Sequence, residues 1–164
     1  MKYAILSLGM FIGVISQSQA QIQTKIGAHI AYGSEIENIG AGVNAEFGLS
    51  NKLSVAPSFT FFFPKDYGYL EQKMWEANAN VHYYFLNTGV VNLYGLGGLN
   101  YANVEVETVW WGSSFSESQA KFGFNVGAGT NFNFGGKIVP FAELKYVVSD
   151  FDQVVVAAGV RLAL

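Results

Sequence analysis

The segment FGFNVGAGTNFNF, residues 122–134, carries the pattern that decides the fold. Nearly every second residue in it is apolar, and most of the residues between are glycine and asparagine. The segment IGAGVNAEFGL, residues 39–49, repeats this alternation. An apolar period of two is typical of β-strands whose two faces meet different surroundings. Both segments are therefore predicted to be strands with one apolar face and one face of small polar residues.

Six further segments extend the alternation over most of the chain. They are residues 53–63, 75–85 and 154–164 and, less regularly, residues 23–33, 91–103 and 138–148. Short stretches with turn-forming residues, such as Ser50-Asn51-Lys52, separate neighbouring segments. We therefore predict an all-β protein with eight antiparallel strands in an up-and-down meander.

The fifth strand leaves its facing open, because it contains several glycines. A regular strand would turn Val91, Leu93 and Leu99 outward and Asn92 and Asn100 inward. Alternatively, a glycine bulge reverses the facing halfway along the strand.

Two prolines, Pro57 and Pro140, fall within predicted strands. Proline cannot donate a hydrogen bond to a neighbouring strand. We expect each proline to lie close to a short connection, where the missing bond costs least.

The first 20 residues have the composition of a secretory signal peptide. Lys2 is followed by an apolar run from residue 4 to residue 15, and Ser18-Gln19-Ala20 is a small-x-small cleavage site. The run is shorter than the ~20 residues of a membrane-spanning helix, although a short membrane anchor is the alternative. We expect residues 1–20 to be removed and residues 21–164 to form one domain.

Composition excludes several classes of protein. The chain has 164 residues, of which 51% are hydrophobic and only 13% are charged; an ordinary soluble domain carries about 25% charged residues. A disordered chain would need low hydrophobicity and high charge. Nine Lys and Arg against twelve Asp and Glu offer no basic patch for nucleic acid, and without cysteine there is no disulfide or thiolate site.

Closure of eight strands into a barrel removes both sheet edges, and the apolar face could then point inward or outward. The polar face consists mostly of Gly, Asn and Ser, which suits a narrow lumen better than a surface in water. The apolar face is rich in Phe, with Tyr32, Trp75, Tyr83 and Tyr101 near strand ends, as in the aromatic girdles of membrane barrels. We predict a transmembrane β-barrel, with a soluble lipocalin-like barrel as the alternative.

The connections give the barrel a direction. If residue 21 starts in the periplasm, the short turns at residues 50–52, 86–89 and 135–137 are periplasmic. The longer connections, predicted at residues 64–72 and 105–118, then face outward, where most of the acidic residues lie. The nine outward acids are Glu35, Glu37, Asp66, Glu71, Glu105, Glu107, Glu117, Asp150 and Asp152. These acidic residues are interpreted as side chains that keep the loops soluble or, alternatively, as a cation site.

Two motifs and the closing strand carry a family resemblance. The motifs are LYGLGG at residues 93–98 and PFAELKY at residues 140–146, the second similar to the P-[YF]-A-E-x-[KR]-Y strand near the end of such barrels. The closing strand resembles the family's assembly signal, although it ends in Leu164 where Phe or Trp is usual. On these features the chain resembles the small eight-stranded outer-membrane β-barrels of Gram-negative bacteria, the OmpA/OmpX-like porin family.

The resemblance implies a location in the cell outer membrane and no cofactor. It implies contact with outer-membrane lipid and lipopolysaccharide, and biogenesis by periplasmic chaperones and the outer-membrane assembly machinery. A peptidoglycan-binding domain of the OmpA type is not expected after Leu164.

Charged residues on the predicted inner face nearly balance one another. They are Lys25, Glu46, Glu76, Lys121, Glu143, Lys145 and Arg161. Balanced charges can pair in an interior of low dielectric, and side chains nearly fill the lumen of an eight-stranded barrel. We predict a salt-bridged plug; the alternative is the gate of a narrow porin-like channel.

Catalytic and metal-binding residues are not predicted. His29 and His82 face the lumen, but no third ligand stands at a metal-binding spacing. Some eight-stranded outer-membrane barrels modify lipid A with a His and a Ser, and no such set stands out here. The protein is predicted not to be an enzyme, with lipid A modification as the least favoured alternative.

An outward loop around Trp110, Trp111 and Phe115 is the predicted surface-binding feature. Residues 104–107 keep the period of two, so the fifth and sixth strands could continue beyond the membrane as a hairpin whose edge pairs with a partner's sheet. The two Trp could instead only anchor the barrel at the membrane surface. The predicted function is structural or adhesive.

Overall fold

All eight predicted strands are present in the computed structural model, which describes residues 23–66, 70–110, 113–150 and 152–164. The side chains of each strand alternate between the two faces of the sheet, as the sequence pattern predicts. The strands are β1 Thr24–Gly33, β2 Asn38–Gly48, β3 Leu53–Asp66, β4 Leu70–Asn87, β5 Val91–Trp110, β6 Ser113–Phe132, β7 Ile138–Ser149 and β8 Gln153–Ala163.

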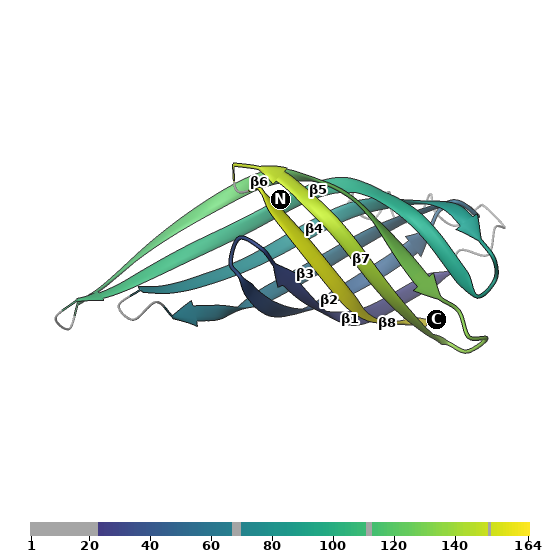
Figure 1. The fold of residues 1–164 in the computed structure, drawn as a ribbon, viewed down its shortest axis with the longest axis horizontal. Coiled ribbons are helices and arrows are strands. Elements are labelled where there is room, and N and C mark those ends of the chain that lie inside the picture. The colour runs from purple at the N-terminus through teal and green to yellow at the C-terminus, as the bar shows by residue number, and fades with distance from the viewer. Residues whose placement is uncertain (1–22, 67–69, 111–112, 151) are drawn as a thin grey trace, which may run out of the picture.

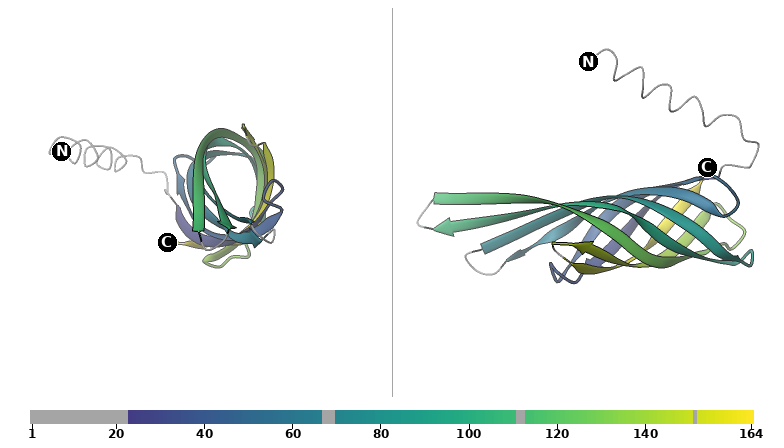
Figure 2. Two further views of the ribbon diagram at one scale, coloured as in Figure 1. Left: turned by 90° about the vertical axis from the view of Figure 1, so that its left-hand side faces the viewer. Right: turned by 90° about the horizontal axis from the view of Figure 1, so that it is seen from above.

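The strands form one closed antiparallel barrel in chain order (Figure 1). β1 and β8 close it, with Lys25 opposite Ala163 and Gly33 opposite Val155. Figure 2 shows the ring of strands end-on. No helix in the described ranges is long and apolar enough to cross a membrane. The eight-stranded meander is therefore confirmed, and closure leaves no free edge in the part of the barrel where all eight strands pair.

The apolar face points outward and the polar face inward. Along β6, the outward Phe122 and Val126 are 79% and 58% exposed, whereas the inward Asn125 is 3% exposed. The same alternation holds in the other strands, so the buried interior is largely a set of Asn, Ser, Thr and charged side chains. Such an exterior is stable against lipid rather than water, and the soluble alternative is wrong.

The middle strands are longer than predicted. β5 and β6 have 20 residues each and stay paired as far as Trp110 and Ser113, so the predicted long loop at 105–118 is wrong and the alternative hairpin is confirmed. The loop predicted at 64–72 is also mostly strand, because β3 continues to Asp66 and β4 starts at Leu70. The charged residues of these segments therefore belong to paired strands rather than to loops.

The fifth strand is regular and needs no bulge of its own. Asn92 and Asn100 point inward and Leu99 points outward, and the β5–β6 register runs unshifted. The irregularity lies instead in β4, where the register shifts between Tyr84 and Leu86.

The two prolines differ in their positions. Pro140 lies near the start of β7, as expected. Pro57 lies inside β3, opposite Ala79, and the prediction of a position beside a connection is wrong for it. Since Pro57 has no N–H, β3 cannot donate there; β2 and β3 pair up to Asn44 and Ser58 and resume pairing only at Phe47 and Val55.

Short turns join the strands at one end of the barrel, at residues 49–52, 88–90 and 133–137. Gly89 and Gly135 have φ of 83° and 81°, a region that glycine enters without steric cost. At the other end, the β3–β4 and β5–β6 hairpins extend past β1, β2, β7 and β8 (Figure 1). The molecule thus has one compact end and one end with a tall, four-stranded sheet.

Candidate functional site

Arg161 is the centre of the first charged cluster in the lumen. Its Nη2 donates to Glu143 Oε1 at 2.6 Å and its Nη1 to Glu46 Oε2 at 3.2 Å. Its Nε and Nη1 also donate to Asn44 and Asn131, each at 2.9 Å. The guanidinium therefore links β2, β6 and β7 to β8, and most of its donors are used, as a buried charge requires.

Glu46 is shared by several donors in this Arg161 cluster. Ser54 Oγ donates to Oε1 at 3.1 Å, Tyr84 donates to the same oxygen, and Lys25 Nζ lies 3.5 Å from it. The side chain of Glu46 is 3% exposed. A carboxylate this deeply buried is stable because several donors surround it.

Glu76 is the centre of a second cluster nearer the middle of the barrel. Lys145 Nζ donates to it at 2.7 Å, and amide groups of Asn78, Asn100 and Gln153 donate at 3.1, 3.2 and 3.3 Å. Glu76 itself is fully buried. The cation and the amides come from four strands, β4, β5, β7 and β8, so the Glu76 cluster joins opposite walls of the barrel.

Six of the seven predicted lumen charges lie in these two clusters. Three acids and three cations occupy the two clusters: Glu46, Glu76 and Glu143 with Lys25, Lys145 and Arg161. Lys121 lies nearer the outer rim, where it lines a small cavity together with Asn100 and Gln153, and its Nζ lies 3.7 Å from Asp150. It lies two residues beyond Gly123, the last β6 residue that pairs with β7, so water reaches it.

The two histidines take different roles in the lumen. His29 Nε2 lies 3.0 Å from Thr60 Oγ1, and its Nδ1 accepts from Asn44 at 3.1 Å. His82 stacks on Tyr94 at 4.3 Å between ring centres, with its Nε2 3.9 Å from Glu143. A cavity of about 20 Å³ beside them has room for about one water molecule. In the part of the chain that the structure describes, no three His, Asp or Glu gather as metal ligands.

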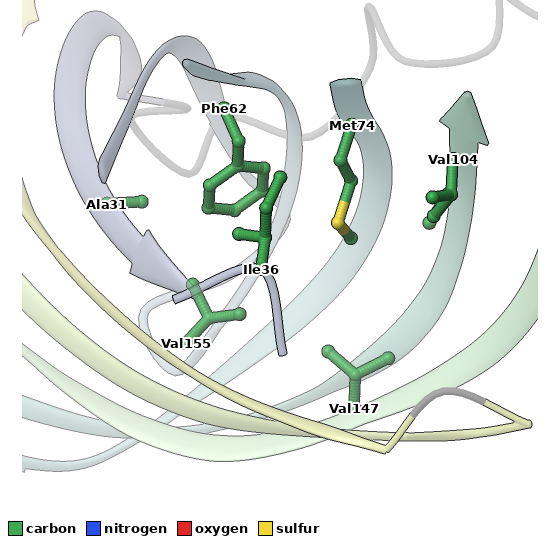
Figure 3. Close-up of a cluster of buried hydrophobic side chains, with 8 residues drawn as sticks. Ala31, Ile36, Phe62, Met74, Val104, Val147 and Val155 are labelled. Atoms are coloured by element: carbon green, nitrogen blue, oxygen red, sulfur yellow. The ribbon is translucent and has the colours of Figure 1, made fainter. Parts of the chain in front are cut away.

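An apolar plug fills the lumen on the outer side of these clusters (Figure 3). Its members are Ala31, Ile36, Phe62, Met74, Ala102, Val104, Val147 and Val155. Ile36 comes from the β1–β2 turn, is fully buried and reaches over the lumen toward Phe62. The cavity left beside the plug is only about 10 Å³. The sequence alone does not predict this plug, because an isolated Ile between Glu35 and Glu37 carries no periodic signal.

The β1–β2 turn that carries Ile36 is held by an ion pair. Glu37 Oε2 accepts from Lys65 Nζ of β3 at 2.6 Å. The hydrogen bond and charge of Lys65 lower the pKa of Glu37 below its ordinary value. Glu37 also has φ of 48°, which is uncommon for a residue other than glycine. The pair therefore holds a locally unfavourable turn closed above the plug.

Gly129 leaves the space that Tyr94 needs beside Glu143. A Cβ at Gly129 would lie 2.5 Å from the Tyr94 ring, whose hydroxyl donates to Glu143 at 2.7 Å. We expect Gly129→Ala to displace this ring and to lower the free energy of unfolding by about 1–3 kcal/mol, the usual cost of overpacking. Urea unfolding of the refolded protein measures it. Gly97→Ala is the control, because its Cβ meets nothing closer than 3.8 Å; an equal loss in the control would contradict the explanation.

A belt of aromatic side chains crosses the outside of β3 to β6. Phe59 stacks on Trp75, Trp75 meets Tyr101 at a tilt and Tyr101 meets Phe122 edge to face, with ring centres 4.8–5.6 Å apart. Aromatic belts mark the boundary between lipid and water. From Tyr101, β5 continues for nine residues to Trp110, so the hairpin extends about 30 Å along the strand beyond the belt.

The predicted surface-binding residues lie at the tip of this hairpin. Trp110 is the last residue of β5 and Phe115 is the third residue of β6, but their side chains lie outside the described part of the structure. Trp111 lies wholly outside the described residues.

Comparison with protein families decides the identity of the barrel. Residues 4–160 match the model of the outer membrane protein β-barrel domain. The chain belongs to this outer-membrane β-barrel family. No curated protein matches the sequence.

Solved structures support the same fold at low sequence identity. The N-terminal barrel domain of OprF from Pseudomonas aeruginosa has a TM-score of 0.66 and 18% identity over 89% of this chain and 100% of that one. Ail of Yersinia pestis, in complex with the heparin analogue sucrose octasulfate, has 0.63 and 20% over 87% and 97%. Neisserial surface protein A has 0.62 and 17% over 87% and 97%.

Membership of this outer-membrane β-barrel family places the protein in the cell outer membrane. Barrels of this kind have short turns toward the periplasm and longer extensions outside the cell. The three short turns therefore mark the periplasmic end, and the protruding hairpins mark the outer end.

Proposed function

We propose that this outer-membrane β-barrel is a non-enzymatic surface protein that holds partners at the sheet formed by the outer parts of β3 to β6. One observation carries the proposal. β7 pairs with β6 only as far as Gly123, so in the described ladder Ser113–Phe122 of β6 has no partner on that side. Such an edge presents unpaired backbone N–H and C=O groups, which readily pair with a strand of another protein.

The charge of the outer end narrows the class of partner. Nine acids but only three lysines, Lys65, Lys73 and Lys121, lie in the outer segments. Ail was crystallised with a polyanion, whereas the acids of this chain would repel one. We therefore propose a neutral or basic protein segment as the partner, with Trp110, Trp111 and Phe115 at the tip as apolar contacts.

The alternative of a narrow channel is less favoured by the lumen. Two charged clusters and the apolar plug leave cavities of only about 20 and 10 Å³, and hydrated ions need more space. The expected result in planar bilayers is therefore an absence of unitary conductance.

The remaining expectations from the sequence stand as parts of this proposal. Residues 1–20 would be removed on export, and residues 21–164 would reach the membrane with the help of periplasmic chaperones and the assembly machinery. The barrel surface would contact lipid and lipopolysaccharide. Unchanged lipid A in cells that overproduce the protein is the expected result for a barrel that is not an enzyme.

Truncation of the long hairpin tests the proposed surface role. Glu105 and Ser118 are cross-strand partners, so residues 106–117 can be replaced by Asn-Gly, which forms a two-residue hairpin turn. We expect the truncated barrel to fold and to show the usual shift in gel migration on boiling. Attachment of producing cells to a surface coated with a basic protein is expected to fall at least tenfold.

The matched control shortens the neighbouring hairpin and leaves the β6 edge intact. Lys65 and Gln72 are partners, so residues 66–71 can be replaced in the same way. Attachment should then remain close to that of the unmodified protein. Full attachment by the 106–117 truncation would exclude the hairpin as the contact surface.

A further inference from the structure

A pocket of about 210 Å³ opens at the periplasmic end of the barrel. Its walls come from β1 to β5 and from the β2–β3 turn, and most lining side chains are polar. Pockets for drug-sized ligands occupy about 300–1,000 Å³, so this one suits a smaller molecule. It lies at the end opposite to the protruding hairpins and does not depend on the proposed surface role.

Lys25 lines this periplasmic pocket with few partners for a buried cation. Its side chain is 9% exposed, and its only hydrogen bond among the described residues is the long one, 3.5 Å, to Glu46. An ammonium group has three N–H donors, so two of them have no partner in the described structure. Glu46 is already held by Ser54, Tyr84 and Arg161. A cation in this state favours an anion that enters the pocket.

Asn92 places a second polar group without a hydrogen-bond partner in the same pocket. The residue is 8% exposed, and its Oδ1 has no hydrogen-bond donor among the described residues. A buried amide oxygen without a donor is costly, and a ligand hydroxyl would satisfy it. Asn51 and Asn87 add further amide groups at the pocket wall.

We propose that this pocket binds a small sugar acid. The carboxylate pairs with Lys25, and a neighbouring hydroxyl group donates to Asn92. A neutral sugar would bring Lys25 no anion besides Glu46, and a simple carboxylate would leave Asn92 Oδ1 without a donor. The ligand reaches the pocket from the periplasm, either as a free sugar acid or as an acidic sugar of a glycan, since both carry the same chemistry.

Titration of the ¹⁵N-labelled protein in detergent micelles tests this site. Glucuronate and glucose form the matched probe pair, because they differ only in a carboxylate that replaces a hydroxymethyl group. Glucuronate is expected to shift the amide signals around Lys25 and Asn92 with a Kd at least tenfold below that of glucose. N-acetylmuramic acid distinguishes the sources: tighter binding than glucuronate indicates a cell-wall sugar, and weaker binding indicates a free sugar acid.

Three variants locate the binding. Lys25→Met should remove the preference for glucuronate, whereas Lys52→Met, in the exposed turn at the same end, should retain it. Asn92→Asp keeps the size of the side chain but places a carboxylate against the ligand, so its Kd should rise at least tenfold. If Lys25→Met does not fold, Asn92→Asp is the variant that tests the proposed site. Equal binding of the two probes, or equal loss in Lys25→Met and Lys52→Met, would overturn the proposal.

Discussion

Replacement of Arg161 by methionine is expected to lower the free energy of unfolding by about 3–5 kcal/mol, because it leaves buried carboxylates without their cation. Arg161 is 2% exposed and donates to both Glu46 and Glu143. Its guanidinium carbon also lies 3.8 Å from the centre of the Phe141 ring. Methionine keeps most of the volume, so the loss reports charge and hydrogen bonds rather than a cavity.

Urea unfolding in lipid vesicles, followed by tryptophan fluorescence, measures this loss. Arg161→Met combined with Glu143→Gln should recover part of it, because the second change removes one unpaired charge. Lys52→Met, at an exposed turn, should change the free energy of unfolding by less than about 0.5 kcal/mol. If Arg161→Met cost no more than an exposed ion pair, about 0–1 kcal/mol, the Arg161 cluster would not stabilise the barrel.

Replacement of Val126 by arginine is the second large effect expected. Val126 faces outward, is 58% exposed and lies midway along the part of β6 that pairs with β7. A charge on the lipid face of a membrane barrel costs about 2–4 kcal/mol at the midplane and about 0–1 kcal/mol near the interfaces. We expect Val126→Arg to lower the free energy of unfolding by about 2–4 kcal/mol. The same urea unfolding in lipid vesicles measures this loss.

Ala120→Arg is the matched control for Val126→Arg. Ala120 lies on the same strand and the same face, two residues beyond Phe122 of the aromatic belt, and is exposed. Ala120→Arg should lower the free energy of unfolding by no more than about 0–1 kcal/mol, the cost near the interfaces. Equal losses at the two positions would show that the belt does not mark the membrane boundary on β6.

The barrel could be predicted from the sequence because its two faces meet very different surroundings. Lipid outside and a narrow polar lumen inside impose a period of two on every strand, and residues 122–134 carry it almost without interruption. The same period continued through Val104–Glu107 and gave the hairpin. The charged residues of that segment are also typical of a loop. Charge alone cannot distinguish the two, since an exposed strand and an exposed loop both place charged side chains in water.

The inward charges could also be predicted, but their partners could not. Which residue faces the lumen follows from alternation alone, whereas the partner of each charge depends on register and barrel closure. Arg161 and Glu143 lie on neighbouring strands, but Lys145 reaches Glu76 across the lumen. Ile36 lies in a turn without periodicity, and only the folded barrel shows that it covers the lumen.

Closure of the barrel joins the two ends of the described chain, with consequences for the order of folding. The N–H of Leu164 donates to Thr24 O at 3.0 Å, and β1 pairs with β8 over nine residue pairs. All other strand pairs are between sequence neighbours, which form early, whereas this seam spans nearly the whole domain and is expected to form last. Until then the curved sheet has two open edges, and a second nascent chain can occupy either one. The rate of this last pairing therefore sets how long the chain is at risk of assembling with a copy of itself.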